Sequence, residues 1–387
     1  MQTRLRAMRR GAMTEAITKG PPMKYAVLLA AAVMAAVSPT VAVARGNAAD
    51  GLQAMRELNA IVLGDLDTRQ HIQGKAFVGG NVKGRLVVAQ GGSQSYRASN
   101  RPQLTVGGNS EGFIVERNLG EPITALVGGN AADMALNGNG TVQVGGVANI
   151  ANFNPRAGKS VQYGTAAINA QAQDAAYLAF TPGLADPRTG LAATIAAQTT
   201  KLADDLGVLS LHLASLASIS TITSTASALD YSRAADGYAV FTMTAAAFQD
   251  QNANFDTLFA GLPAGMTTIV NVLGDTLVQG GNINATALNQ TVIWNFAQAT
   301  SITTKGWHGS ILAPLATLTN SSAIEGSVAV RAFTMNGEVH LGTFAGTSAI
   351  VASAVPEPAT WAAMLVGFAM IAATLRGRRR GTALFSH

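Results

Sequence analysis

A short glycine-rich repeat constrains the fold of this 387-residue chain more than any other feature of its sequence. Val-Gly-Gly-Asn occurs at 78–81, 106–109 and 127–130, and Val-Gly-Gly follows at 144–146, at intervals of 28, 21 and 17 residues. Such spacing is typical of the coils of a solenoid. We expect the glycine pairs to take backbone conformations that other residues avoid, and the asparagines to hydrogen-bond to one another along the stack. Unrelated glycine-rich hairpins in a β-sandwich are the alternative.

Short β-prone runs accompany the repeats. The chain has them at 75–78, 86–89, 141–144, 239–241, 268–273, 291–296, 310–314 and 326–330. They predict a mainly β chain, a right-handed β-solenoid whose later strands resume the coils after an interruption.

The interruption is an alanine- and leucine-rich stretch at about 164–218. Residues 166–180 are alanine-rich and are expected to be helical, and residues 191–216 carry apolar side chains at steps of three, four and seven. These side chains form one stripe: Ile195, Leu202, Leu206, Leu209, Leu213 and Leu216. Because Gly207 interrupts the pattern and flanking charge pairs are lacking, we expect this helical insert to pack on a flank of the solenoid, with a coiled-coil dimer as the alternative.

The N-terminal end predicts export. Lys24 precedes an apolar run at 25–37, and Ala42 and Ala44 are small residues placed as a signal peptidase requires. We therefore interpret residues 1–44 as a signal peptide that includes a helix, and Met23 is an alternative start.

The C-terminal end predicts a membrane segment. An uncharged run at 359–375 gives a helix of about 26 Å, slightly short of the ~30 Å hydrocarbon core. It lies between Val355, Pro356, Glu357 and Pro358 on one side and a basic stop on the other, made of Arg376, Arg378, Arg379 and Arg380. By the positive-inside rule the arginines stay cytoplasmic.

This order at 351–387 resembles the PEP-CTERM sorting signal of Gram-negative bacteria. The resemblance implies that an exosortase processes the chain near Pro-Glu-Pro. An ordinary C-terminal membrane anchor is the alternative.

Charge and cysteine content narrow the function of the exported part. Of the 26 basic and 21 acidic residues, ten basic and two acidic ones lie in the two ends, which leaves 16 basic and 19 acidic residues. This slightly acidic balance argues against a nucleic-acid partner. Since the chain has no cysteine, no disulfide supports the fold, and a large core has to stabilise it.

The residues do not favour an enzyme. Histidines stand at 71, 212, 308, 340 and 387, without a spacing suited to a shared metal, so we expect no catalytic residues, no metal and no cofactor. Asp65 and Asp67 lie on one face of a predicted strand and could serve a solenoid glycan lyase or hydrolase, or bind a cation. We favour a turn-capping Asp65 and a solvated Asp67.

Residues 60–66, leading into the repeat at 77–81, resemble the opening of the choice-of-anchor A domain, and residues 293–296, 309–314, 324–326 and 337–344 resemble its close. The resemblance covers 45–350, is weakest at about 155–235, and implies an adhesive β-solenoid related in plan to ice-binding domains. We expect an exported protein of the cell envelope, cell surface or extracellular biofilm matrix that binds a surface or an exopolysaccharide. Ice binding is a further alternative, but Thr-x-Thr occurs at 221–223 and 317–319 without a regular period.

Overall fold

The computed structural model describes residues 46–92, 97–121 and 123–352, together with 367 and 370. Within these residues the named strands pair in parallel, coil upon coil, in three rows. The predicted mainly β chain with many parallel strands and a helical insert is confirmed.

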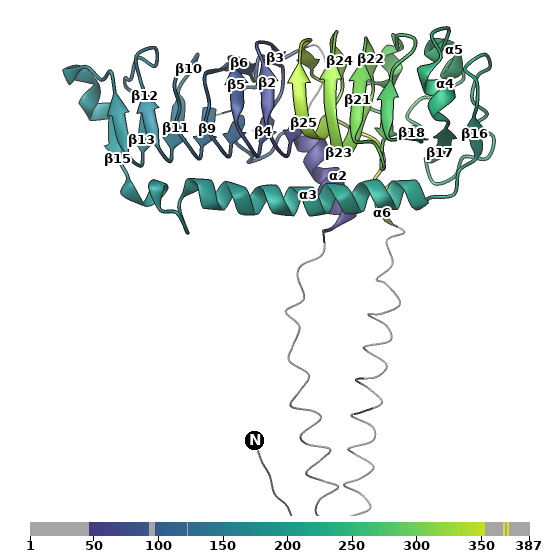
Figure 1. The fold of residues 1–387 in the computed structure, drawn as a ribbon, viewed down its shortest axis with the longest axis horizontal. Helices are drawn as coiled ribbons and strands as arrows, with labels where there is room; N and C mark the ends of the chain where they lie inside the picture. The colour runs from purple at the N-terminus through teal and green to yellow at the C-terminus, as the bar shows by residue number, and fades with distance from the viewer. Residues whose placement is uncertain (1–45, 93–96, 122, 353–366, 368–369, 371–387) are drawn as a thin grey trace, which may run out of the picture. The chain divides into compact units, whose positions relative to one another are not determined.

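The first row of strands, here called the α3 row, follows helix α3 (Leu191–Ser215) along its length (Figure 1). In spatial order its members are β15 (Leu178–Phe180), β13 (Lys159–Tyr163), β11 (Gly140–Val144), β9 (Ile123–Val127), β7 (Leu104–Val106), β4 (Ala76–Val78), β1 (Ala60–Val62), β25 (Val328–Met335), β23 (Ser310–Asn320), β20 (Val292–Asn295), β18 (Thr267–Val272), β17 (Tyr238–Met243) and β16 (Ser220–Ile222).

The chain does not build this row from one end to the other. It begins in the middle at β1 and adds coils outward to β15, and α3 then carries it past the whole row to β16 (Figure 1). From β16 the coils return until β25 pairs with β1, Ala60 opposite Val328. The later strands resume the coils as predicted, but they close on the first strand instead of extending the last.

Two further rows complete the coils. The second row contains β14 (Ala166–Ile168), β12 (Val147–Asn149), β5 (Val82–Gly84), β2 (Leu66–Thr68), the C-terminal parts of β25 and β23, β21 (Ser301–Thr304) and β19 (Thr276–Val278), with single bridges at Ser110 and Ala131 between β5 and β12. The third row contains β10 (Met134–Leu136), β8 (Phe113–Val115), β6 (Leu86–Val88), β3 (His71–Ile72), β26 (Val339–His340), β24 (Ile324–Glu325) and β22 (Trp307–His308). The shorter helices are α2 (Ala48–Glu57), η1 (Ala172–Tyr177), η2 (Pro182–Ala185), α4 (Ala245–Gln249), α5 (Phe255–Leu258), η3 (Thr286–Leu288) and α6 (Ala349–Ala352).

The burial of the strands shows where the core lies. Every residue of β1 is buried, whereas β2 alternates between buried and exposed residues. Val62 packs inside the coils, and Ile61 packs in a second cluster with residues of α2 and α3. The α3 row is thus buried on both faces where the helices cover it, and the other two rows keep one face in water.

The predicted apolar stripe of α3 is confirmed. Ile195, Leu202, Leu206, Leu209 and Leu213 are buried in the cluster between the helices and the α3 row. The sixth predicted residue, Leu216, lies just past the end of the helix and is only partly buried against this cluster. Gly207 does not interrupt the helix, and a Cβ added to it would have no heavy atom within 4 Å. The stripe therefore packs on the flank of the solenoid.

Buried polar contacts also attach α3 to the later coils. The Oγ of Ser210 donates to Oδ1 of Asn295 at 2.6 Å, and Nδ2 of Asn295 donates to the Ser210 carbonyl at 2.9 Å. Nδ2 of Asn271 donates to the carbonyl of Leu213 at 2.9 Å. These bonds fix the register of the helix against β18 and β20.

The prediction of a helix over 166–180 is wrong. These residues form β14, the 3-10 helix η1 and β15. Their alanine content favours a helix, but β14 and β15 complete a coil by pairing with β12 and β13, and such pairing overrides local propensity. Helices α2, α4 and α5 were not predicted from the sequence either.

The glycine pairs are required for a reason other than the one predicted. None of the repeat glycines has a positive φ. A Cβ on Gly107 would lie 2.1 Å from the carbonyl oxygen of Gly79 one coil earlier, and 3.3 Å from Ile195 of α3. A Cβ on Gly108 would lie 2.4 Å from Oδ1 of Asn81. The first glycine thus allows close stacking under α3, and the second leaves room for the preceding asparagine.

Candidate functional site

The predicted sorting and cleavage residues lie outside the described part of the chain. These are Ala42, Ala44, Val355, Pro356, Glu357, Pro358, Arg376, Arg378, Arg379 and Arg380. Within the described residues, no helix has both the length and the apolar character needed to cross a membrane.

The repeat asparagines form the predicted column at one corner of the solenoid. The backbone N–H of Asn109 donates to Oδ1 of Asn81 at 2.9 Å, and the next coils repeat the bond from Asn130 to Asn109 and from Val147 to Asn130, each at 2.8 Å. Asp65 starts this column, since its Oδ1 accepts the backbone N–H of Asn81 at 2.7 Å. The carboxylate therefore has a structural partner.

Asp67 lies two residues further, on the exposed side of β2. The strand register sets it between Lys83 of β5 and Thr334 of β25. A salt bridge to Lys83 is not among the contacts of the described residues. Asp65 and Asp67 thus differ in role, one a backbone acceptor at the corner and the other a solvated residue, as the sequence analysis favoured.

Three of the histidines lie along the third row with two glutamates. Nδ1 of His340 lies 2.5 Å from Glu325, and its Nε2 lies 2.9 Å from Glu338. His71 lies 3.7 Å from Glu338, and the strand register sets His308 beside Glu325. Their spacing along the chain is irregular, so the sequence did not predict that these histidines lie near one another. No group of three or more potential metal ligands in the described residues is arranged to hold a metal ion.

The surroundings shift the pKa values of two of these histidines in opposite directions. The hydrogen bond to Glu325 raises the pKa of His340 above its ordinary value, although burial opposes this. Burial lowers the pKa of His308, despite the nearby carboxylates of Glu325 and Asp256. His340 therefore holds its proton to a higher pH than His308.

Hydroxyl side chains form two lines across the outer face of the second row, here called the hydroxyl face. Parallel register sets Thr276, Ser301 and Thr317 side by side on β19, β21 and β23. Two residues further along the same strands, the register continues with a second line of side chains: Val278, Thr303, Thr319, Thr334, Asp67 and Lys83. The residues that lie between the two lines on each strand, such as Ile302 and Leu318, point into the core and are buried.

The spacing of these hydroxyls follows from strand geometry. Neighbours lie about 4.8 Å apart between strands and about 6.7 Å apart along a strand. Thr276, Thr303 and Thr334 are exposed, while Ser301 and Thr319 are partly exposed. Thr317 is held from one side by the guanidinium of Arg331. The result is a rigid, regular surface of weak hydrogen-bonding groups with methyl groups between them.

The regularity arises in the fold, because the coils have different lengths. Of the residues on the hydroxyl face, only Thr317 and Thr319 belong to a Thr-x-Thr pair noted in the sequence. The other predicted pair, Thr221 and Thr223, lies at β16 in the α3 row. The other residues of the hydroxyl face could have been predicted from a weaker signal, namely a single Thr or Ser followed by an apolar residue in each β-prone run.

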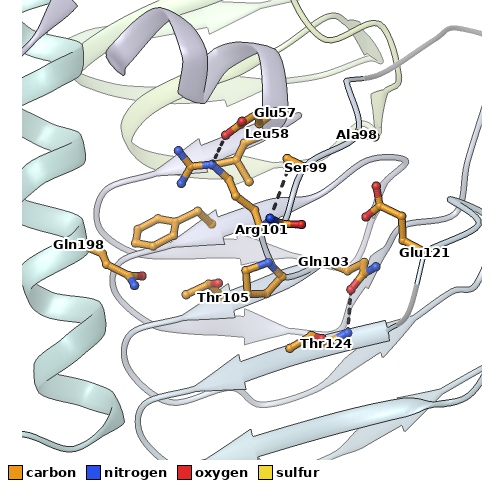
Figure 2. A pocket seen from close by; sticks show the side chains of 13 residues that line it. Glu57, Leu58, Ala98, Ser99, Arg101, Gln103, Thr105, Glu121, Thr124 and Gln198 are labelled. Atoms are coloured by element: carbon orange, nitrogen blue, oxygen red, sulfur yellow. Dashed lines mark hydrogen bonds and ion pairs between the residues drawn. The ribbon is translucent and has the colours of Figure 1, made fainter. Parts of the chain in front are cut away.

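A groove of about 1010 Å³ opens between α2, α3 and the segment 98–103 (Figure 2). Glu57 and Leu58 line it at the end of α2, Gln198 on α3, and Phe77 and Thr105 on strands of the α3 row. Further lining residues are Ala98, Ser99, Asn100, Arg101, Pro102, Gln103, Glu121 and Thr124. No sequence pattern predicted this groove.

Ion pairs fix the charged groups around the groove. Nε of Arg101 lies 2.5 Å from Glu57 (Figure 2). The buried Nζ of Lys75 lies 2.5 Å from Glu121. Burial raises the pKa of Glu57, but hydrogen bonds from Arg101 and Gln53 outweigh it and hold this pKa below its usual value. Both acidic groups are thus matched by a basic neighbour.

Comparison with known proteins finds a matching family and a similar solved structure. The family described as "Putative Ice-binding-like adhesive domain" matches residues 51–341. No curated protein matches the chain. Among solved structures, an ice binding protein from an Antarctic bacterium, Flavobacteriaceae, matches at 11% identity over 77% of this chain and 99% of that one, with a TM-score of 0.22, too low to carry a structural argument. The family match spans most of the chain, including both halves of the solenoid, and the chain belongs to the family of ice-binding-like adhesive domains.

Proposed function

We propose that this chain is an exported, non-enzymatic adhesive protein that binds a hydroxyl-rich surface or exopolysaccharide through the hydroxyl face. The observation that carries the proposal is the pair of hydroxyl lines that register aligns across β19, β21, β23 and β25. Membership of an adhesive domain family supports it.

The chemistry of the hydroxyl face suits adhesion to a repeating polymer. Each hydroxyl both donates and accepts a hydrogen bond, and each bond contributes about 1 kcal/mol or less against competing water. Many such contacts on a rigid lattice add up through multivalency. Asp67 and Lys83 extend the second line with charged groups that can bind polar substituents of the polymer.

The test replaces Thr303 and Thr319 together with Val, which keeps the β-branched shape and removes two hydroxyls. The full-length chain, purified in detergent, is passed over beads that carry extracted exopolysaccharide. We expect retention to weaken about tenfold or more, which corresponds to ~1.4 kcal/mol. Thr200→Val, on α3 away from the hydroxyl face, is the control and should retain wild-type binding. Equal retention of all three proteins would contradict the proposal.

Ice binding is the second candidate, and the same two lines favour it, because a flat and regular set of Thr residues is what that function requires. Against it, the face is interrupted by Ala332 in the first line and passes into Asp67 and Lys83 in the second. Inhibition of ice recrystallisation by the wild type, lost in the Thr303→Val, Thr319→Val variant, would favour ice over a polymer.

The proposal includes the route to the surface. A signal peptidase would remove residues 1–44, and an exosortase would act near Pro356, Glu357 and Pro358, with the apolar run at 359–375 in the inner membrane. The motif, the uncharged run and the arginines occur in the expected order, which supports this route. The protein would then reside in the cell envelope, on the cell surface or in the extracellular matrix.

A further inference from the structure

The groove beside α2 and α3 lies on the α3 row and is separate from the hydroxyl face. We propose that it is a second binding site, specific for a neutral oligosaccharide or the end of a neutral glycan chain. The inference does not depend on the proposed function, since it concerns a different surface with different chemistry.

Size and lining agree with a ligand of this class. A volume of about 1010 Å³ lies at the upper end of the range of ~300–1,000 Å³ usual for ligand sites. Pro102 is partly exposed, and the C–H face of a sugar ring can pack against it. Leu58 and Phe77 also line the groove but are only 2% and 4% exposed. Amide and hydroxyl groups of Gln198, Asn100 and Thr105 line the same space.

Several polar groups at the groove remain available to a ligand. Thr105 is 4% exposed, and its hydroxyl has no hydrogen-bond partner within the described residues. The Gln198 side chain is exposed and likewise makes no hydrogen bond there. Arg101 uses Nε to bond Glu57, which leaves its two terminal nitrogens without a partner in the described residues. A sugar hydroxyl can donate to or accept from these groups in place of water.

The charges favour a neutral ligand over an acidic one. A carboxylate or phosphate that approached Arg101 would compete with Glu57 for the guanidinium, and it would also meet Glu121 on the opposite side (Figure 2). A sugar hydroxyl can accept from the terminal nitrogens of Arg101 without displacing Glu57. Because the paired charges hold their side chains in place, little ordering is required on binding.

The groove is also held rigid by backbone contacts. Oε1 of Gln103 accepts the backbone N–H of Thr124 at 2.7 Å (Figure 2). Nζ of Lys75 donates to the carbonyl of Ser99 at 2.7 Å. These bonds join the segment 98–103 to the strands below it. The wall that this segment forms is therefore fixed in place.

The experiment titrates the full-length chain in detergent with cellotetraose, maltotetraose and chitotetraose as neutral probes and with tetragalacturonic acid as the acidic probe, by calorimetry. We expect at least one neutral probe to bind. Gln198→Ala should weaken that binding about tenfold, Gln198→Trp should abolish it by filling the groove, and Thr105→Val should weaken it. Thr200→Ala, on the same helix outside the groove, is the matched control.

Each result decides the inference. Neutral binding that is lost in Gln198→Trp supports it, provided that circular dichroism shows the variant to be folded. No binding of the neutral probes, binding of the acidic probe alone, or neutral binding unchanged in Gln198→Trp overturns it. The Thr303→Val, Thr319→Val variant should bind the probes normally, so failure of this inference and failure of adhesion through the hydroxyl face are distinguishable.

Discussion

The carboxylate of Asp65 takes the place of an asparagine in the corner column. Its Oδ1 accepts the backbone N–H of Asn81 at 2.7 Å and the side-chain Nδ2 of Asn81 at 3.0 Å. Asn81 in turn accepts the backbone N–H of Asn109. Asp65 is thus the first acceptor of a column that continues through the earlier coils.

We expect Asp65→Asn to leave stability nearly unchanged, because an amide oxygen can accept the same two bonds. Asp65→Ala should lower the free energy of unfolding by about 1 kcal/mol or more, since it leaves the Asn81 N–H without an acceptor. Urea denaturation of the two variants measures the difference. An equal loss in both would mean that the negative charge of Asp65 matters, not its acceptor atom.

The adhesive and the glycan-cleaving hypotheses make opposite predictions for Asp65 and Asp67. If the protein is adhesive, the double variant Asp65→Asn, Asp67→Asn should retain exopolysaccharide nearly as well as the wild type, and neither protein should shorten it. The measurement is the appearance of new reducing or unsaturated ends. Chain cleavage by the wild type that disappears in the double variant would favour a lyase or hydrolase.

Gly107 and Gly207 form a matched pair for testing why glycine is needed. Gly107→Ala should destabilise the fold by more than about 1 kcal/mol, and Gly107→Val by more, because the new Cβ would lie 2.1 Å from the Gly79 carbonyl. Gly207→Ala should stabilise α3 by about 0.5–1 kcal/mol, since its Cβ would meet nothing within 4 Å. Thermal melts measure both. An unchanged melting temperature for Gly107→Ala would show that the coils can separate at little cost.

His340 should make stability depend on pH. Its pKa is raised in the folded state, so its contribution is fully present below the unfolded value of about 6.5 and is lost as the pH rises through the folded pKa. The loss of unfolding free energy in His340→Gln should therefore be larger at about pH 6 than at about pH 8. Denaturant titrations at the two pH values measure it.

His308 supplies the opposite control. Burial lowers its folded pKa, so its contribution is present above about pH 6.5 and is lost as the pH falls through the folded value. His308→Gln should therefore cost more at the higher pH. If the loss of unfolding free energy changed with pH in the same direction in both variants, the conclusion that Glu325 and Glu338 stabilise the protonated form of His340 would be contradicted.

Sorting gives a prediction for the C-terminal end. Replacement of Pro356, Glu357 and Pro358 with alanine should leave an unprocessed inner-membrane form in a host that has an exosortase, because the processing enzyme would no longer recognise its motif. Fractionation and intact mass of the wild type and the variant measure this. The wild type in a host without exosortase is the control, and equal display and mass of both proteins in the first host would rule the motif out.

Local sequence patterns determined the repeating part of the fold. The Val-Gly-Gly-Asn repeat predicted the coils and the asparagine column, and the leucine spacing predicted the flank of α3, because these features depend on residues that recur at fixed places in each coil. The helix predicted over 166–180 is wrong, because the pairing of β14 and β15 with the preceding coil outweighs the local preference of these residues for a helix.

The tertiary structure alone decided where distant segments meet. Closure of β25 on β1, with Ala60 opposite Val328, places the start of the domain in the middle of the solenoid. The hydroxyl lines and the groove depend on the same long-range arrangement. Because the coils differ in length, Ser301, Thr317 and their neighbours do not recur at a fixed period in the sequence, although the strands align them. The groove forms because α2, α3 and the segment 98–103 come together only when the coils are stacked.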